Sequence, residues 1–315
     1  MNLWLKIFIY ILAGFILRSQ KLLSEKIIGA FIDVALYFFI PVFILTAAWG
    51  SPVDVQITMN IGIVATGVLL AGTGFAAAFS WYRLKSAGSI KGSIKDSIKQ
   101  NAVPGRAGYR ETFRKTCLPV IFMNSAYLSI PINSYYFGSE GLLYAVIYNV
   151  VITFFNSTLG IWLIGGRGIG EIFRIPFLYA SIAGLALNFA NVPQPAFLIT
   201  LNNFLKDTAM PAILLLVGYN INLNKALFLK DAAMAAGIRI FGGFLSGYLI
   251  TTLLGLKGAA AGVAILASSM PSAINTYILS KKYSADPEFA ASAIAIGTLC
   301  SFITLPLIEK FLNIS

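Results

Sequence analysis

The sequence contains no histidine, and only 11% of its 315 residues are charged. The absence of histidine excludes Ser-His-Asp triads, HExxH zinc sites and haem ligation by histidine. Soluble domains carry about 25% charged residues, so the low charge content excludes an ordinary water-soluble protein. The two cysteines, Cys117 and Cys300, lie in or next to apolar segments, which argues against a disulfide framework. No aspartate pair stands at catalytic spacing, and we expect no enzyme, no cofactor and no metal site.

Long apolar runs fill most of the chain. Hydrophobic residues make up 58% of the sequence, and the mean hydropathy is +0.81. Runs of about 17 to 25 apolar residues are long enough to cross a bilayer core of about 30 Å as helices. The sequence therefore predicts an all-α polytopic membrane protein with ten transmembrane helices and no soluble domain. The predicted spans are 3–18, 26–49, 57–82, 113–137, 141–165, 174–191, 195–219, 231–255, 257–283 and 287–312.

The net charge of +11 is distributed unevenly between the connecting loops. Basic residues gather after odd-numbered helices, above all in the segment 83–115, whereas the loops after even-numbered helices hold almost none. The positive-inside rule places the basic loops in the cytoplasm and both termini on the outer side of the cytoplasmic membrane. The basic excess therefore indicates topology and a lipid bilayer as partner, and we expect no nucleic-acid binding. The Ser-Ile-Lys repeat at 89–99 predicts either a helix on the membrane surface or a solvated linker.

The chain resembles itself at two offsets, which predicts an internal repeat. An offset of 170 aligns helices 1 to 3 with helices 6 to 8 and pairs Pro41 with Pro211, which we interpret as kinks in a static scaffold. An offset of 147 aligns helices 4 and 5 with helices 9 and 10. The predicted units are residues 1–165 and 166–315, each with five helices, so the second unit has the inverted orientation. Chance matching among abundant Gly, Ala and Pro is the alternative.

Polar residues at mid-membrane depth mark the candidate site, because buried polar groups are costly there unless they line a cavity or bond to protein. Pro271 is expected to break helix 9, and the repeat-equivalent Asn124 segment is expected to break helix 4. Half-helices that begin at the midplane point unpaired N–H groups and a partial positive charge at an anion such as a carboxylate. The alternative is ordinary kinks with serines bonded to their own backbone. The candidate substrate-binding residues are Asn124, Ser125, Ser129, Pro131, Asn149, Ser269, Pro271, Ser272 and Asn275.

Predicted helix 5 places four polar residues, Tyr148, Asn149, Thr153 and Asn156, on roughly one face. This face is expected to look into the bundle. Hydrogen bonds between helices explain the face as well as substrate contact does.

Charged residues within the predicted spans are few, and each costs about 2.5 to 3.5 kcal/mol at the centre of a membrane helix. Asp33 or Asp207 is a candidate carrier of a coupling proton. Lys206 or Arg239 is a candidate to attract an anion, and a plain ion pair of either residue with an aspartate is the equal alternative.

Three motifs resemble the auxin efflux carrier family of membrane transport proteins. They are residues 23–26 leading into helix 2, residues 123–131, and residues 270–275 followed by 281–288. The resemblance extends over essentially the whole chain. It implies the ten-helix fold shared with bile-acid sodium symporters, in which helices 1, 2, 6 and 7 form a scaffold and helices 3–5 and 8–10 move. It also implies that broken helices 4 and 9 cross at Met123–Asn124 and Pro271–Ser272.

Two departures from the plant members of that family indicate a prokaryotic member. The long loop follows helix 3 instead of helix 5, and Met123 stands where the plant carriers tend to have proline. Family substrates are carboxylates, among them auxin in plants and malonate or malate in bacteria. The resemblance and the residues together predict a secondary transporter of a small organic anion, a mono- or dicarboxylate, that works by alternating access. A symporter coupled to Na⁺ or H⁺ is the alternative, an anion channel is a weaker one, and a homodimer is left open.

Overall fold

The computed structural model describes residues 3–20, 34–50, 54–89, 106–166, 170, 176–220 and 229–313. Within these ranges the regular structure is helical, and one isolated β-bridge joins Met123 to Ser272. The all-α expectation is therefore confirmed for the described part of the chain. Asp33 lies outside the described residues, as do residues 90–105 of the 83–115 loop.

The elements of the first half correspond in order to the predicted spans, and short π-helical turns (η) interrupt two of the helices. They are α1 (Leu3–Ser19), η1 (Ala35–Phe39), α3 (Ile40–Gly50), α4 (Val55–Ser89), α6 (Arg106–Ile121), α7 (Ser129–Phe155), η2 (Asn156–Gly160) and α8 (Ile161–Leu163). The second half contains α9 (Pro176–Phe189), α10 (Ala196–Asn220), α11 (Leu229–Gly237), η5 (Ile238–Gly242), α12 (Gly243–Leu253), α13 (Gly258–Ser268), α14 (Ile274–Lys282) and α15 (Pro287–Phe311).

The helix α7 is two helices joined at a sharp turn. Gly138 has φ 60° and ψ −138°, a conformation that residues with a side chain avoid. The chain reverses so closely that a Cβ at Gly141 would collide with the carbonyl oxygen of Asn133. The turn lies at the predicted boundary between the spans 113–137 and 141–165.

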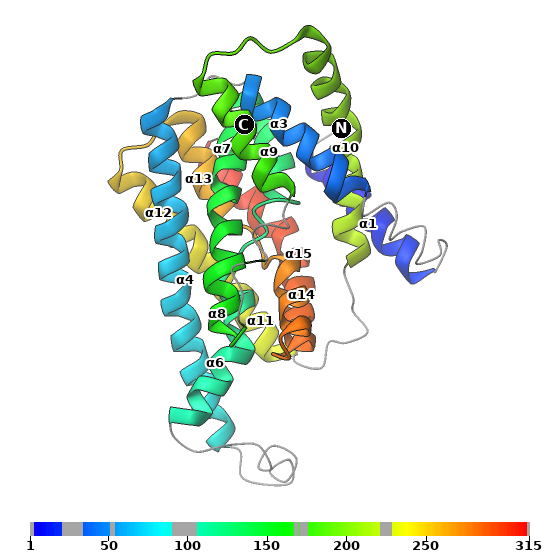
Figure 1. Cartoon of the computed structure of the whole chain (residues 1–315). Helices are drawn as coiled ribbons and strands as arrows, with labels where there is room; N and C mark the ends of the chain where they lie inside the picture. Colours follow the sequence, from blue (N-terminus) through cyan, green and yellow to red (C-terminus); the bar gives the residue numbers. More distant parts are fainter. Residues whose placement is uncertain are drawn as a thin grey trace.

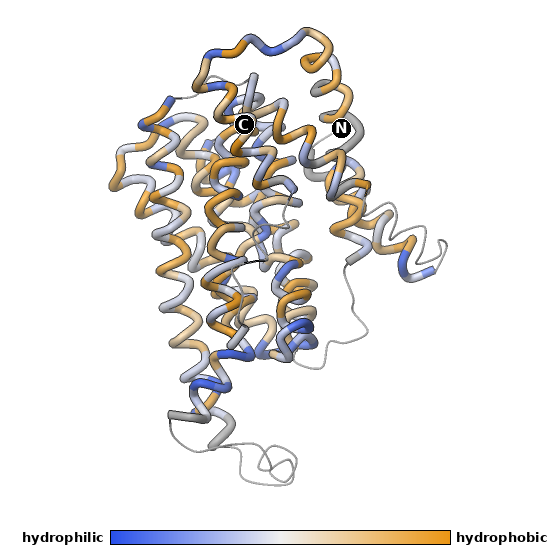
Figure 2. Tube along the Cα trace, in the orientation of Figure 1, coloured by the Kyte–Doolittle hydropathy of each residue, from blue (hydrophilic) through white to orange (hydrophobic). Residues whose placement is uncertain are grey.

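Four helical stretches in the described part of the chain are long and apolar enough to cross a bilayer. They are Val55–Ser86, Ser129–Leu163, Lys230–Leu253 and Pro287–Phe311. On α15 the exposed residues Leu299, Ile303 and Leu307 repeat every four positions, and such an apolar stripe fits lipid and not water. Apolar residues run along the helices in Figure 2, and hydrophilic residues gather at the lower end, where α6 begins. The chain is thus a multi-pass helical membrane protein, while the ten-helix inverted repeat stays a prediction.

The helices pack into two groups (Figure 1). The first group contains α1, α3, α9 and α10, in which α1 lies along α10 and α3 lies along α9. A Cβ at Gly14 would meet the backbone of Leu215, and one at Gly218 would meet the backbone of Ile11, so glycines let α1 and α10 approach closely. The second group contains α4, α6, α7 and α11 to α15. The two groups meet where α3 and α9 contact α7 and where α1 contacts α15.

Candidate functional site

The first interruption follows α6, which ends at Ile121. Residues 122–124 are not helical, and a turn over 125–128 leads into α7. The Asn124 side-chain oxygen accepts a hydrogen bond from the Tyr127 amide at 3.1 Å, as the N-cap residue of a helix does. Asn124 therefore lies in the break between α6 and α7 and stabilises the turn that leads into α7.

The second interruption separates α13 from α14. Pro271 has no amide hydrogen and disfavours a helical conformation at the residue before it, so α13 ends at Ser268. Ala273 then has extended dihedral angles, and α14 begins at Ile274. Both interruptions lie at the segments that the sequence indicated.

The two interrupted segments cross and pair with each other. The Asn124 amide donates to the Pro271 carbonyl oxygen at 2.7 Å, and the Ala273 amide donates to the Phe122 carbonyl oxygen at 3.0 Å. The Ser272 hydroxyl also donates to the Pro119 carbonyl oxygen at 2.6 Å. Backbone groups that left their helices thus regain partners across the crossing, as the interior of a membrane protein requires.

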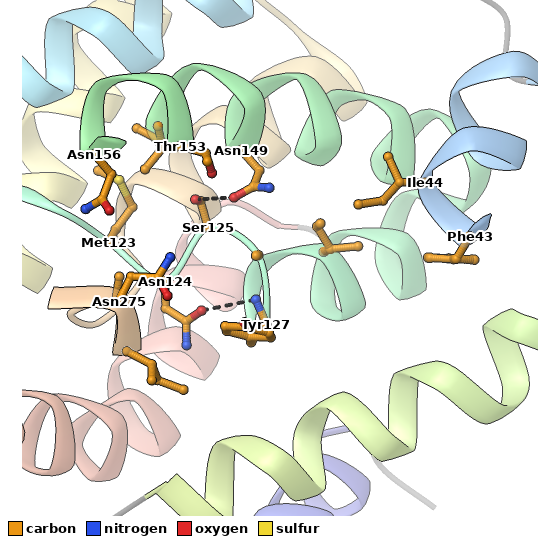
Figure 3. Close-up of a pocket in the computed structure, with 15 residues that line it drawn as sticks. Phe43, Ile44, Met123, Asn124, Ser125, Tyr127, Asn149, Thr153, Asn156 and Asn275 are labelled. Atoms are coloured by element: carbon orange, nitrogen blue, oxygen red, sulfur yellow. Dashed lines mark hydrogen bonds between the residues drawn. The ribbon is translucent and has the colours of Figure 1, made fainter. Parts of the chain in front are cut away.

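The crossing opens on a cavity of about 60 Å³. A water molecule needs about 10 to 15 Å³ by this measure, so the cavity has room for about four to six waters, or for a small organic ion of similar bulk. Figure 3 shows its labelled residues, which come from α7 and η2, from the two crossing segments and from α3. Its lining comprises Phe43, Ile44, Met123, Asn124, Ser125, Ala126, Tyr127, Ile130, Asn149, Ile152, Thr153, Asn156, Ala273, Ile274 and Asn275.

Asn149 lines the cavity and has a buried side-chain donor without an acceptor. It is 2% exposed, and its side-chain oxygen accepts a hydrogen bond from the Ser125 hydroxyl at 2.8 Å (Figure 3). Its side-chain Nδ2 is buried and has no hydrogen-bond partner. A buried donor without a partner costs roughly 1 to 3 kcal/mol, which an acceptor in the cavity would recover.

The N-terminus of α14 also faces the cavity. Ile274 and Asn275 form the first turn of α14 and belong to the lining. Amide groups in the first turn of a helix have no partner within the helix and carry partial positive charge. The described part of the lining contains no charged side chain, so amide groups and the N-terminus of α14 are its polar donors.

Four of the predicted binding residues line the cavity: Asn124, Ser125, Asn149 and Asn275. The other five lie elsewhere in the two broken helices. The Ser129 hydroxyl accepts a hydrogen bond from the Asn133 side chain, and Pro131 is buried in the first turn of α7. The Ser269 hydroxyl donates to the Ile265 carbonyl oxygen of its own helix. Pro271 and Ser272 hold the crossing together through the bonds given above.

Several lining residues were not among the predicted binding residues. Thr153 and Asn156 follow Asn149 by four and seven positions, so the polar face of helix 5 was the signal for them. Tyr148, from the same face, instead shares a hydrogen bond with the Ser268 hydroxyl at 2.9 Å. Phe43 and Ile44 come from the other helix group, and nothing in their sequence marks them.

Arg239, predicted to attract the anion or to pair with an aspartate, does not line the cavity and forms no ion pair with an aspartate among the described residues. Its side chain is 1% exposed, and its guanidinium donates to backbone carbonyl oxygens of α6 and α13. The described part of the chain offers it no carboxylate within ion-pair distance. Lys206 and Asp207 belong to α10, and their side chains lie outside the described part.

The sequence matches a family profile described as membrane transport protein over residues 169–309. An uncharacterized transporter of Methanothermobacter thermautotrophicus is 26% identical over 314 residues, which cover 96% of this chain and 95% of the relative. Auxin efflux carrier component 1 of Arabidopsis thaliana is 25% identical over 144 residues, which cover 44% of this chain and 23% of the plant protein. The chain is therefore similar to membrane transport proteins, among them the auxin efflux carriers. A second archaeal relative, an uncharacterized transporter of Methanocaldococcus jannaschii, is 26% identical over 196 residues, 58% of this chain and 63% of that protein.

Proposed function

We propose that the protein is a secondary transporter that carries a small organic anion, a mono- or dicarboxylate, across the cytoplasmic membrane by alternating access. The observation that carries this proposal is the buried, unpartnered Nδ2 of Asn149 in a cavity at the crossing of two broken helices. In discontinuous helices of transporters, half-helix N-termini typically point at anionic substrate groups.

The cavity suits a carboxylate for a chemical reason. A carboxylate is a pure acceptor with about four lone-pair sites, and Asn149, Asn124 and the first turn of α14 supply donors. These donors are neutral, so they hold an anion without the strong attraction of a buried cation. A transporter must release its substrate on the other side, which favours such moderate binding.

The position of the cavity between the two helix groups supports alternating access. Phe43 and Ile44 on α3 form one wall, and α7 with the crossing segments forms the rest. In the proposed mechanism the first group, helices 1, 2, 6 and 7 of the predicted ten, is the static scaffold. The second group, helices 3–5 and 8–10, moves the site from one side of the membrane to the other. Both termini lie outside in this scheme.

The variant Asn149→Asp tests the site with almost no change in shape. The aspartate oxygen still accepts from Ser125, but the donor is lost and a negative charge faces the anion. We expect the apparent affinity in proteoliposome uptake of labelled mono- and dicarboxylates to fall by about 10- to 100-fold.

The control is Asn60→Asp on α4, because Asn60 accepts from Gln56 at 3.2 Å and an aspartate would keep that bond. It adds the same charge away from the cavity and is expected to transport normally. Uptake by Asn149→Asp at the level of Asn60→Asp would remove the cavity as the binding site.

A further inference from the structure

Arg239 occupies an unusual position for a charged residue. It lies in η5, near the middle of the apolar stretch Lys230–Leu253, and is among the largest fully buried side chains of the described residues. A charged side chain at this depth is expensive unless its hydrogen bonds are met. Its Nη1 and Nη2 have hydrogen-bond partners, whereas its buried Nε has none among the described residues, so the partners of the two terminal nitrogens indicate what it does.

The guanidinium binds the ends of both broken helices at once. Its Nη1 donates to the carbonyl oxygens of Val120 at 3.2 Å and Ile121 at 2.8 Å, the last residues of α6. Its Nη2 donates to the carbonyl oxygen of Ser268 at 2.9 Å, the last residue of α13. All three acceptors are C-terminal carbonyl groups that lack partners within their own helices.

The positive charge of the guanidinium is balanced by the partial negative charges of the two helix C-termini. Each helix C-terminus carries a partial charge of about −0.5, so two termini together offset roughly one guanidinium charge. The protein therefore needs no carboxylate at this point, and the described part of the chain provides none. In transporters with discontinuous helices, C-terminal ends and unwound carbonyls of half-helices commonly coordinate the coupling Na⁺.

We infer that Arg239 is a built-in cation that takes the position a coupling metal ion would hold, so that transport by this protein does not depend on Na⁺. The inference rests on the proposed transport function and deepens it. Arg239 acts as a positioning residue, because it touches the half-helix ends and does not line the cavity. A fixed cation keeps the ends of α6 and α13 together in every state of the cycle, whereas a bound Na⁺ would leave with the substrate.

The first experiment uses the wild-type protein in NaCl or in choline chloride at equal ionic strength. We expect the same melting temperature in detergent and the same carboxylate flux in proteoliposomes. A flux or a melting temperature that requires Na⁺ would overturn the inference. This comparison needs no variant, and its thermal part needs no substrate, so the inference and the proposed function can fail separately.

The second experiment replaces the cation. We expect Arg239→Ala to lower the melting temperature and to reduce flux by at least about tenfold. Millimolar guanidinium or Na⁺ should restore part of both quantities, because a free cation can enter the vacated position. Arg239→Lys keeps the charge on a smaller head group and is expected to fall between the wild type and Arg239→Ala.

The comparison variant is Ser272→Ala, which removes a crossing hydrogen bond without vacating space for a cation. Neither cation should improve its stability or its flux. The inference fails if Arg239→Ala behaves as the wild type, if neither cation restores it, or if both cations restore Ser272→Ala equally. Should Arg239→Ala not fold, the wild-type comparison and Arg239→Lys decide the matter.

Discussion

The Arg239 guanidinium fits because one neighbouring residue has no side chain. A Cβ at Gly243, one turn along the same helix, would collide with Nη2 of Arg239 and with the carbonyl oxygen of Ser268. Both atoms belong to the hydrogen bond that ties Arg239 to the end of α13. Glycine at position 243 is therefore required for the hydrogen bonds by which Arg239 joins the ends of α6 and α13.

The variant Gly243→Ala is expected to destabilise the protein by about 1 to 3 kcal/mol, the usual cost of overpacking a filled site. Gly237→Ala is the matched control, because a Cβ at Gly237 would meet nothing within 4 Å. That change should be neutral or stabilising by roughly 0.5 to 1 kcal/mol, since alanine favours helix more than glycine does. Melting temperatures of the two purified variants check the contrast, and equal values would contradict the described packing of Arg239.

The sequence indicated where the two helices are interrupted, but it did not indicate which side chains face the cavity. Short polar residues at mid-depth marked the two interruptions, because such residues cap helices and proline ends them. Whether a given side chain faces the cavity depends on how each half-helix is rotated at the crossing. Asn149 and Asn275 face the cavity, whereas Ser269 and Ser272 bond to backbone, and no local pattern separates the two pairs.

At the scale of helices, a second arginine ties helix ends together near the basic loop. Nη1 of Arg114 donates to the carbonyl oxygens of Ile164 at 3.4 Å and Tyr283 at 3.3 Å, just beyond the ends of α8 and α14. Glu111 fixes the guanidinium from one turn away, with an Arg114 Nε to Glu111 oxygen distance of 2.9 Å. The ion pair thus positions a contact among three helices.

The hydrogen bond from Arg114, reinforced by Lys115 and opposed by partial burial, lowers the pKa of Glu111 from 4.5 to about 2. Because the pKa is lower in the folded state, ionised Glu111 stabilises the fold above about pH 4.5, and this contribution is lost as the pH falls towards 2. We expect Glu111→Gln to have a lower melting temperature than the wild type at pH 7, with a difference that shrinks steadily below pH 4.5. A difference that is independent of pH would show that the charge of Glu111 is not the cause.

Helix bounds were predictable to the extent that apolar length determines them. The predicted spans 3–18, 195–219 and 287–312 agree with α1, α10 and α15 to within one residue at each end. The third span was predicted to end at residue 82, whereas α4 continues to Ser89. Hydropathy detects only the part of a helix that crosses the bilayer, so it does not detect the turns that extend into water beyond Trp81 and Tyr82. The π-helical turn η1 lies just before Pro41, where it relieves the clash of the proline ring with the preceding turn, and no periodicity predicts such a turn.

At the scale of the whole molecule, the proposed mechanism requires the two helix groups to slide past each other. Direct contacts between the groups must then break and re-form during each cycle. Phe8 on α1 and Phe302 on α15 form such a contact, with ring centroids 5.3 Å apart. Phe244 on α12 and Phe311 on α15 form a similar edge contact at 5.6 Å, but both belong to the second group. The chain therefore offers two aromatic pairs of similar geometry, one between groups and one within a group.

A cross-link at each pair distinguishes sliding groups from a fixed pore. In a Cys300→Ala background, which removes the exposed native thiol, the double variants Phe8→Cys/Phe302→Cys and Phe244→Cys/Phe311→Cys are treated with a short bismaleimide. We expect the cross-link between groups to abolish carboxylate flux, because it prevents α15 from moving along α1, and the cross-link within the second group to leave most of the flux. Single-cysteine variants treated in the same way control for modification alone. Full flux through the cross-linked Phe8→Cys/Phe302→Cys protein would mean that the anion crosses without relative motion of the groups, as in a channel.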